Sequence, residues 1–139
     1  MKKLGKELCT AKVHTAVGRE GGTSRSDDGR LDIKHSVPGA PGTGTNPEQL
    51  FAAGWSTCFE SAMVIAARKK KIARPADLAI DAEVDLCTND DGYFLQARFN
   101  VSLPGLDRQV AKSLVDAGEQ LCPYSKAIRG NVDVVFALV

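Results

Sequence analysis

Two cysteines, Cys58 and Cys122, are the residues of this chain best suited to covalent chemistry. Cys58 lies in a long apolar stretch that begins at Leu50, and Cys122 opens the segment 122–126 (CPYSK). A thiol that meets a second thiol can form a disulfide that a further dithiol then reduces. The two cysteines therefore suggest a redox function, provided that other residues support it.

Each cysteine also has a simpler interpretation. A thiol in apolar surroundings has a raised pKa and is inert, so Cys58 needs a positive neighbour to act as a nucleophile. Cys122 precedes Pro123, where a helix can begin, and a helix N-terminus lowers the pKa of a cysteine; an ordinary loop cysteine is the alternative. Cys9 and Cys87 fall on predicted strands, and we expect neither to be catalytic.

Arg19 and Glu48 are the candidate activating residues. Arg19 lies among glycines after a predicted strand, and Glu48 could hold its guanidinium through a bidentate pair. A solvated arginine and a helix-start acid are the simpler interpretations.

Glu48 and Cys58 are ten residues apart on one predicted helix, so about 15 Å separates them along its axis. Either the long arginine spans that gap or a second subunit supplies both residues. Small residues at 52–54 would allow close helix approach, so we predict a homodimer.

Composition limits the class of protein. The 139 residues indicate one domain, 1–139, with 43% hydrophobic and 25% charged residues and a net charge of +1. These values do not indicate nucleic-acid binding.

The basic start lacks the apolar region of a signal peptide, so we predict a cytoplasmic protein, in which structural disulfides are rare. Residues 50–67 contain one charge, Glu60, and are short for a membrane span, so we predict a buried core helix and no membrane partner.

Periodicity predicts an α+β fold. A helix should begin at Asn46-Pro47-Glu48 and run to about Lys71, with a second helix over 107–121 and a short one from Pro123 to Gly130. Alternating apolar residues predict strands over 8–17, 31–37, 77–88, 93–103 and 132–138.

Other reactive constellations do not occur in the sequence. His14 and His35 are far apart, there is no Cys-x-x-Cys, and no zinc-ligand spacing is present. The glycine-rich loop 39–44 lacks the Gly-Lys-Ser/Thr of a phosphate-binding loop. We therefore predict neither a metal site nor a nucleotide site.

The segments 46–54 (NPEQLFAAG), Cys58-Phe59 and 122–127 (CPYSKA) resemble the Ohr/OsmC family, and specifically its organic hydroperoxide resistance (Ohr) subgroup. The resemblance covers nearly the whole chain and includes 18–21 (GREG) and Gly130-Asn131. Trp55 stands where the family often has tyrosine, and Glu60 is also unusual.

This resemblance implies a thiol peroxidase that reduces organic hydroperoxides. Cys58 would be the peroxidatic cysteine, Cys122 the resolving cysteine, and Arg19 with Glu48 the activating pair. The implied fold is an intertwined homodimer, with antiparallel sheets wrapped around long central helices. No cofactor would be bound; dihydrolipoamide or a lipoylated protein would be the external dithiol. The apolar surroundings of Cys58 favour alkyl or lipid hydroperoxides, with contacts expected from Phe51 and Trp55.

Three alternatives remain open. An OsmC-type peroxidase would use a broader range of peroxides, and the order of activity on organic and inorganic peroxides separates the two. A peroxide sensor would signal through the same disulfide without turnover, although the sequence has no DNA-binding segment. A small-molecule binding module would function unchanged after replacement of Cys58.

Overall fold

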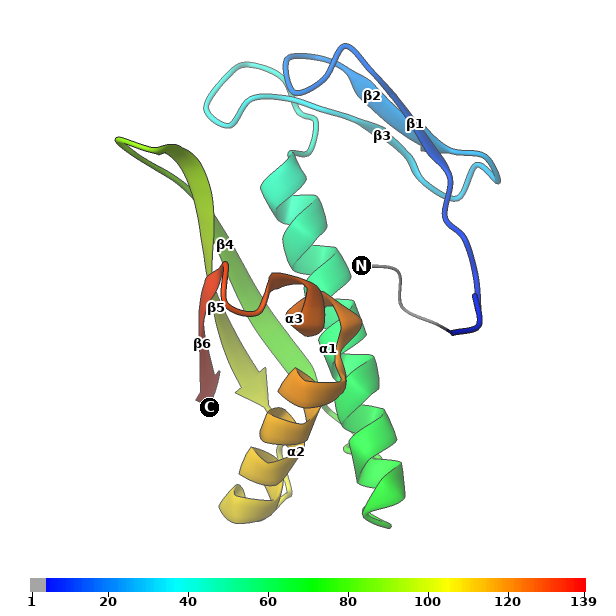
Figure 1. Cartoon of the computed structure of the whole chain (residues 1–139), viewed down its shortest axis with the longest axis vertical. Helices are drawn as coiled ribbons and strands as arrows, with labels where there is room; N and C mark the ends of the chain where they lie inside the picture. The colour runs from blue at the N-terminus through cyan, green and yellow to red at the C-terminus, as the bar shows by residue number, and fades with distance from the viewer. Residues whose placement is uncertain (1–4) are drawn as a thin grey trace. The chain divides into compact units, whose positions relative to one another are not determined.

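The computed structural model describes residues 5–139 and divides into two compact units, which meet in the chain at Pro47 and Glu48 and are described separately. The first unit is an antiparallel sheet of β1 (Val13–Ala16), β2 (Thr23–Ser26) and β3 (Asp32–Lys34), in that order (Figure 1). The predicted strands 8–17 and 31–37 are therefore too long. β2 was not predicted, because its sequence TSRS has no apolar alternation.

Hydrogen bonds between side chains connect β1, β2 and the residue that follows β3 in the first unit. Thr15 Oγ1 lies 2.8 Å from Ser24 Oγ, and Ser24 Oγ lies 2.7 Å from His35 Nε2. Ser24 and His35 are both buried, so these polar atoms depend on one another for hydrogen bonding. A small sheet with few apolar residues is thus held together partly by buried polar contacts.

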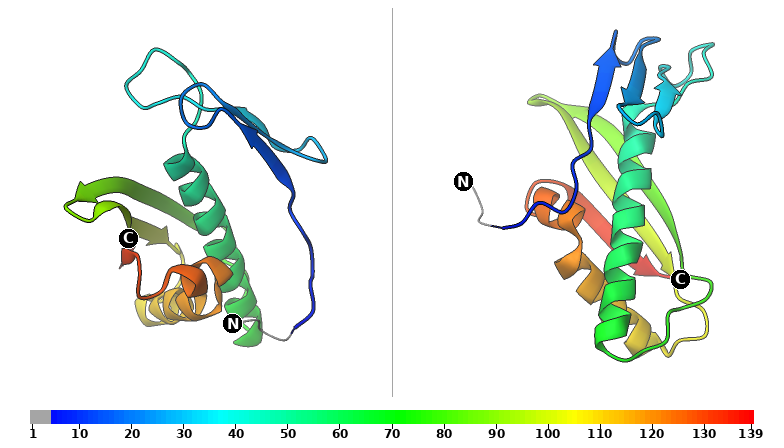
Figure 2. Two further views of the ribbon diagram at one scale, coloured as in Figure 1. Left: turned by 45° about the horizontal axis from the view of Figure 1, so that its top comes forward. Right: turned by 90° about the vertical axis from the view of Figure 1, so that its right-hand side faces the viewer.

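The second unit contains α1 (Pro47–Lys69), β4 (Ala79–Asn89), β5 (Gly92–Ser102), α2 (Arg108–Leu121), α3 (Pro123–Ile128) and β6 (Asp133–Leu138). The three strands form a sheet in the order β4-β5-β6, and α1 and α2 lie beside it (Figures 1 and 2). β4 and β5 form the predicted antiparallel hairpin. The resemblance implied antiparallel sheets, but β6 pairs in parallel with β5, because α2 and α3 form a crossover connection between them.

The helix α1 begins at Pro47 as predicted and ends two residues before Lys71. Lys71 adopts a left-handed conformation, with φ of 57°, and its N–H donates to Arg68 O. The N–H of Ile72 donates to Ala67 O. This pair of hydrogen bonds is a Schellman motif, which satisfies the last carbonyls of the helix and stops it.

The core of the second unit lies between the helices and one face of the sheet. An aromatic cluster forms its centre: the ring of Phe59 lies 5.0 Å from Phe136 and 5.7 Å from Phe99, measured between ring centroids. The side of α1 that faces this core contributes six buried residues: Trp55, Phe59, Ala62, Met63, Ala66 and Ala67. The predicted core role of this helix is thus confirmed for one side of it, whereas the other side, including Ile65, is exposed.

Within residues 5–139, one helix, Pro47–Lys69, is long and apolar enough to cross a membrane by length and composition. Its most apolar window has a mean hydropathy of 1.4, and a third of that window is buried inside the protein. The core helix of a soluble protein passes the same test, so this finding is weak evidence for a membrane span.

The outer face of the β4–β5 hairpin contains an ion-pair network. The Arg98 guanidinium donates to both carboxylate oxygens of Asp85, at 2.7 and 2.9 Å, and to Glu83 at 2.6 Å. These hydrogen bonds, and one from Gln96, lower the pKa of Asp85 to about 2. The ionised form of Asp85 is therefore favoured by the folded hairpin.

We expect this network to make stability depend on pH in acid. Because the folded-state pKa of Asp85 lies below its ordinary 3.8, the contribution is complete above about pH 4 and is lost as the pH falls towards 2. Asp85→Asn should remove part of that pH dependence, as measured by urea unfolding at pH 2, 4 and 7. The control is Asp81→Asn on the same face of β4, where Asp81 lies opposite Asn100 rather than a cation. Equal pH slopes for the two variants would contradict the expectation.

Candidate redox site

The second unit brings Cys58 and Cys122 into contact, although they are far apart in sequence. Both are free cysteines; Cys58 is half-buried on α1 and Cys122 is fully buried. Burial raises the pKa of the Cys58 thiol above its ordinary 9.0, a hydrogen bond from the Tyr124 backbone N–H lowers it, and the Cys122 side chain raises it again. Two free thiols close enough to affect one another's ionisation are placed to form a disulfide once one of them is oxidised.

Cys122 occupies the junction of two helices. Its backbone N–H donates to Gly118 O at 2.9 Å and caps the C-terminus of α2, and its backbone carbonyl accepts from Lys126 N–H at 3.0 Å at the start of α3. The predicted place of Cys122 at a helix N-terminus is thus confirmed. Gly118 lets α2 approach α1 closely, because a Cβ there would lie 2.8 Å from Met63 Cγ.

Tyr124 covers the turn of α1 that precedes Cys58. A Cβ at Gly54 would lie 2.9 Å from the Tyr124 hydroxyl, so glycine is what allows this ring to rest on the helix. The ring also meets Phe51 edge-on, with centroids 6.3 Å apart, and is 41% exposed. Phe51 and Tyr124 therefore form an aromatic pair on α1, and the Tyr124 backbone N–H reaches Cys58. Close approach of a second helix at residues 52–54 in a dimer stays a prediction.

Trp55 lies in the core rather than on an open surface. It is fully buried, its ring centroid lies 4.6 Å from that of Phe99, and its Nε1–H donates to Ser125 Oγ at 3.0 Å. Behind α3, Trp55 and Ser125 border a cavity of about 230 Å³ that Arg129 also lines. Contact of Trp55 with a substrate stays a prediction, whereas its packing role is evident.

Arg19 lies in the first unit, in the turn between β1 and β2. Gly18 and Gly21 have φ of 80° and 84°, and a Cβ at Gly22 would lie 2.3 Å from the carbonyl oxygens of Ala16 and Gly18. The turn thus requires the glycines that surround Arg19 in the sequence. Glu48 lies in the first turn of α1, as expected. The pairing of Arg19 with Glu48 and its action on Cys58 stay predictions.

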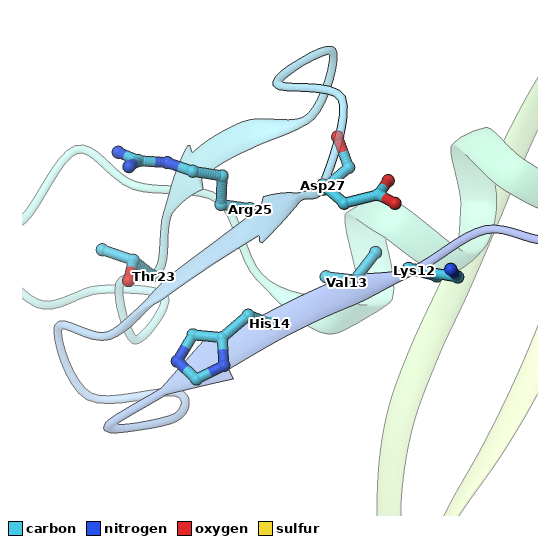
Figure 3. A pocket seen from close by; sticks show the side chains of 7 residues that line it. Lys12, Val13, His14, Thr23, Arg25 and Asp27 are labelled. Carbon is cyan, nitrogen blue, oxygen red and sulfur yellow. The ribbon is translucent and has the colours of Figure 1, made fainter.

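The first unit has its own cavity, of about 600 Å³, beside β1 and β2 (Figure 3). It is lined by Lys12, Val13, His14, Thr23, Arg25, Ser26 and Asp27. Its lining combines both signs of charge and contains no thiol, so it is not the redox site. Among residues 5–139, no group of three or more His, Cys, Asp or Glu side chains could hold a metal ion.

A comparison with protein families matches residues 40–137 to the model described as OsmC-like protein. The chain belongs to the OsmC-like family. The organic hydroperoxide resistance protein of Xanthomonas axonopodis pv. citri (strain 306) is 42% identical over 137 residues, covering 96% of each chain. OhrB of Bacillus subtilis (strain 168) is 45% identical over 136 residues, covering 94% of this chain and 98% of that one.

A solved structure supports the same OsmC-like fold. The crystal structure of an organic hydroperoxide resistance protein OsmC from Legionella pneumophila superimposes with a TM-score of 0.89 at 39% identity. The match covers 96% of this chain and 98% of that chain. The family and the α+β fold that the sequence motifs suggested are therefore confirmed.

Sequence reasoning assigned no role to Tyr124, Ser125 or Gly118 of this OsmC-like chain. The first two stand within the CPYSK segment, but the contacts that distinguish them are made with α1, about 70 residues away, and leave no local pattern. Cys87 lies on β4 as predicted, opposite Phe94. Cys9 was placed on a strand, but it is exposed and precedes β1, which begins only at Val13.

Proposed function

We propose that this chain is a cysteine-based peroxidase that reduces organic hydroperoxides to alcohols. The observation that carries the proposal is the contact of two free thiols, Cys58 on α1 and Cys122 at the start of α3. Relatives at 42–45% identity are named organic hydroperoxide resistance proteins, which supports the same substrate class.

The proposed cycle uses both thiols. The Cys58 thiolate attacks one peroxide oxygen, the O–O bond breaks, and the leaving alkoxide takes a proton to give the alcohol, with Cys58 left as a sulfenic acid. The Cys122 thiol then condenses with the sulfenic acid, forming the Cys58–Cys122 disulfide and releasing water. An external dithiol supplies two electrons and two protons and restores both thiols.

Activation of Cys58 is assigned to Arg19, oriented by Glu48. Burial is the largest influence on the Cys58 pKa and raises it, so the thiolate needs a cation to stabilise it at neutral pH. A guanidinium remains charged at any physiological pH and can also donate hydrogen bonds to the peroxide. Arg19 is half-buried in a turn that its glycines shape, which suits a fixed rather than a freely solvated side chain.

Arg19→Ala should slow alkylation of Cys58 by iodoacetamide at pH 7 by about tenfold or more and move the midpoint of its pH profile upward. The thiolate loses its cation, whereas the burial that raises the thiol pKa remains. The profile is measured in a Cys122→Ser background, so that one thiol of the pair reacts. Arg25→Ala is the matched control, since Arg25 lies on β2 and pairs with Asp32 at 3.3 Å. Equal profiles for both variants would exclude Arg19 as the activator.

The reductant, the absence of a cofactor and the dimer follow from the family resemblance, and the location and excluded partners from the composition. No cofactor is bound, and the reductant is dihydrolipoamide or a lipoylated protein. The protein is a cytoplasmic homodimer without nucleic-acid or membrane partners. The alkyl group of the hydroperoxide is assigned to the apolar side chains of α1 that precede Cys58, Phe51 and Trp55, whose rings contact each other.

Steady-state turnover tests the proposal. Wild-type protein is given tert-butyl hydroperoxide or hydrogen peroxide, each with dihydrolipoamide or glutathione. We expect dihydrolipoamide-dependent turnover that is faster with the organic peroxide. Comparable rates with both peroxides would indicate a broad OsmC-type peroxidase. Disulfide formation without turnover with either reductant would indicate a sensor instead.

A further inference from the structure

A buried hydrogen bond links the two helices that carry the cysteines. Trp55 Nε1–H on α1 donates to Ser125 Oγ on α3 at 3.0 Å, and both side chains are buried, at 0% and 4% exposure. Trp55 precedes Cys58 by three residues and Ser125 follows Cys122 by three. The bond therefore lies about one helical turn from each thiol.

This bond is a buried side-chain hydrogen bond that joins α3 to α1, beside the packing of Tyr124 on Gly54. The helix α3 has six residues, too few to be stable without tertiary packing. The Trp55 indole is fully buried and packed between the rings of Phe99 and Phe51, at centroid distances of 4.6 and 5.6 Å, which disfavours its movement with a displaced α3. Loss of the acceptor would leave a buried N–H without a partner, which is costly. The indole thus fixes Ser125, and with it the start of α3.

We propose that Trp55 and Ser125 are positioning residues that hold Cys122 within reach of oxidised Cys58. Neither contacts the reacting sulfur atoms in this role; they act through the placement of α3. The proposal rests on the proposed function, because it concerns the step that follows peroxide attack on Cys58.

The pair determines which of two reactions consumes the sulfenic acid. Condensation with the Cys122 thiol forms the disulfide, releases water and does not depend on peroxide concentration. Attack on a second hydroperoxide oxidises Cys58 to a sulfinic acid, releases a second alcohol and becomes faster as peroxide rises. A displaced Cys122 slows only the first reaction, so the peroxide concentration that inactivates half of the protein measures the placement of α3.

Ser125→Ala tests the inference. We expect half-inactivation at a peroxide concentration about five- to tenfold lower than for wild type, with sulfinic Cys58 quantified by mass spectrometry. The second-order rate constant for the first attack, measured in a single turnover, should be unchanged, which a general loss of structure would not produce. Ser113→Ala is the matched control, a helix serine whose Oγ–H donates to Val110 O within α2. It should inactivate like wild type.

Ser125→Thr should restore wild-type inactivation, because it retains the hydroxyl oxygen and the adjoining cavity of about 230 Å³ can take its methyl group. Ser125→Val, which has the shape of threonine without the hydroxyl, also removes the acceptor and provides the same measurement if Ser125→Ala does not fold. Unchanged half-inactivation in the folded variants, with wild type forming the disulfide, would overturn the positioning role. Absence of any oxidation product at Cys58 in wild type would instead overturn the proposed peroxidase function.

Discussion

Cys58→Ser is expected to lower kcat/KM for tert-butyl hydroperoxide by more than about a thousandfold. The hydroxyl of serine is a far weaker nucleophile than a thiolate and cannot form the sulfenic acid on which the cycle depends. Turnover is followed by peroxide consumption with excess dihydrolipoamide. The substitution removes one half-buried sulfur, so the folded structure should persist, which circular dichroism can verify.

The matched control is Cys87→Ser. Cys87 is also a half-buried free cysteine, but it lies on β4 opposite Phe94 and outside the contact between Cys58 and Cys122. It should retain wild-type kcat/KM. Loss of activity in Cys87→Ser together with activity in Cys58→Ser would move the peroxidatic role to β4 and refute the proposed site.

Phe99→Ala is expected to reduce the free energy of unfolding by about 3–5 kcal/mol. Phe99 is fully buried, and its ring contacts Trp55, Phe59 and Phe136 at centroid distances of 4.6, 5.7 and 5.5 Å. Alanine would leave a cavity at the meeting point of α1, β5 and β6. Urea unfolding of the reduced protein gives the change.

Phe94→Ala is the control for this loss. Phe94 lies on the same strand but faces the outer side of the hairpin and is 42% exposed, so its removal should cost less than about 1 kcal/mol. If Phe99→Ala and Phe94→Ala lose similar free energies of unfolding, the buried aromatic cluster does not dominate the stability of the second unit.

Elements with a strong period or clear end signals were predictable. The alternation of 77–88 and 93–103 identified β4 and β5, and Pro47 with Glu48 identified the start of α1. By contrast, β2 is made of polar residues and is fixed by pairing with its neighbours, which a local pattern does not record. The end of α1 depends on the left-handed conformation of Lys71, a residue type that rarely adopts it.

For the candidate site, the sequence identified the reactive residues but not the tertiary contacts that position them. Cys58 and Cys122 stood out because two motifs occur together, and their contact follows from packing between α1 and α3. The Tyr124 N–H near Cys58 and the bond from Trp55 to Ser125 each join residues more than 60 positions apart. Such contacts depend on the tertiary fold, so no spacing in the chain could reveal them.

The parallel pairing of β5 and β6 has a consequence for newly made chains. β4 and β5 form a local hairpin, but β6 can pair only after the whole crossover through α2 and α3, which includes Cys122, is in place. We therefore expect the thiol pair to be completed among the last steps of folding. In a chain synthesised during oxidative stress, Cys58 would meet peroxide before Cys122 is in contact with it. Irreversible oxidation of Cys58 should then accumulate in newly synthesised protein rather than in fully folded protein.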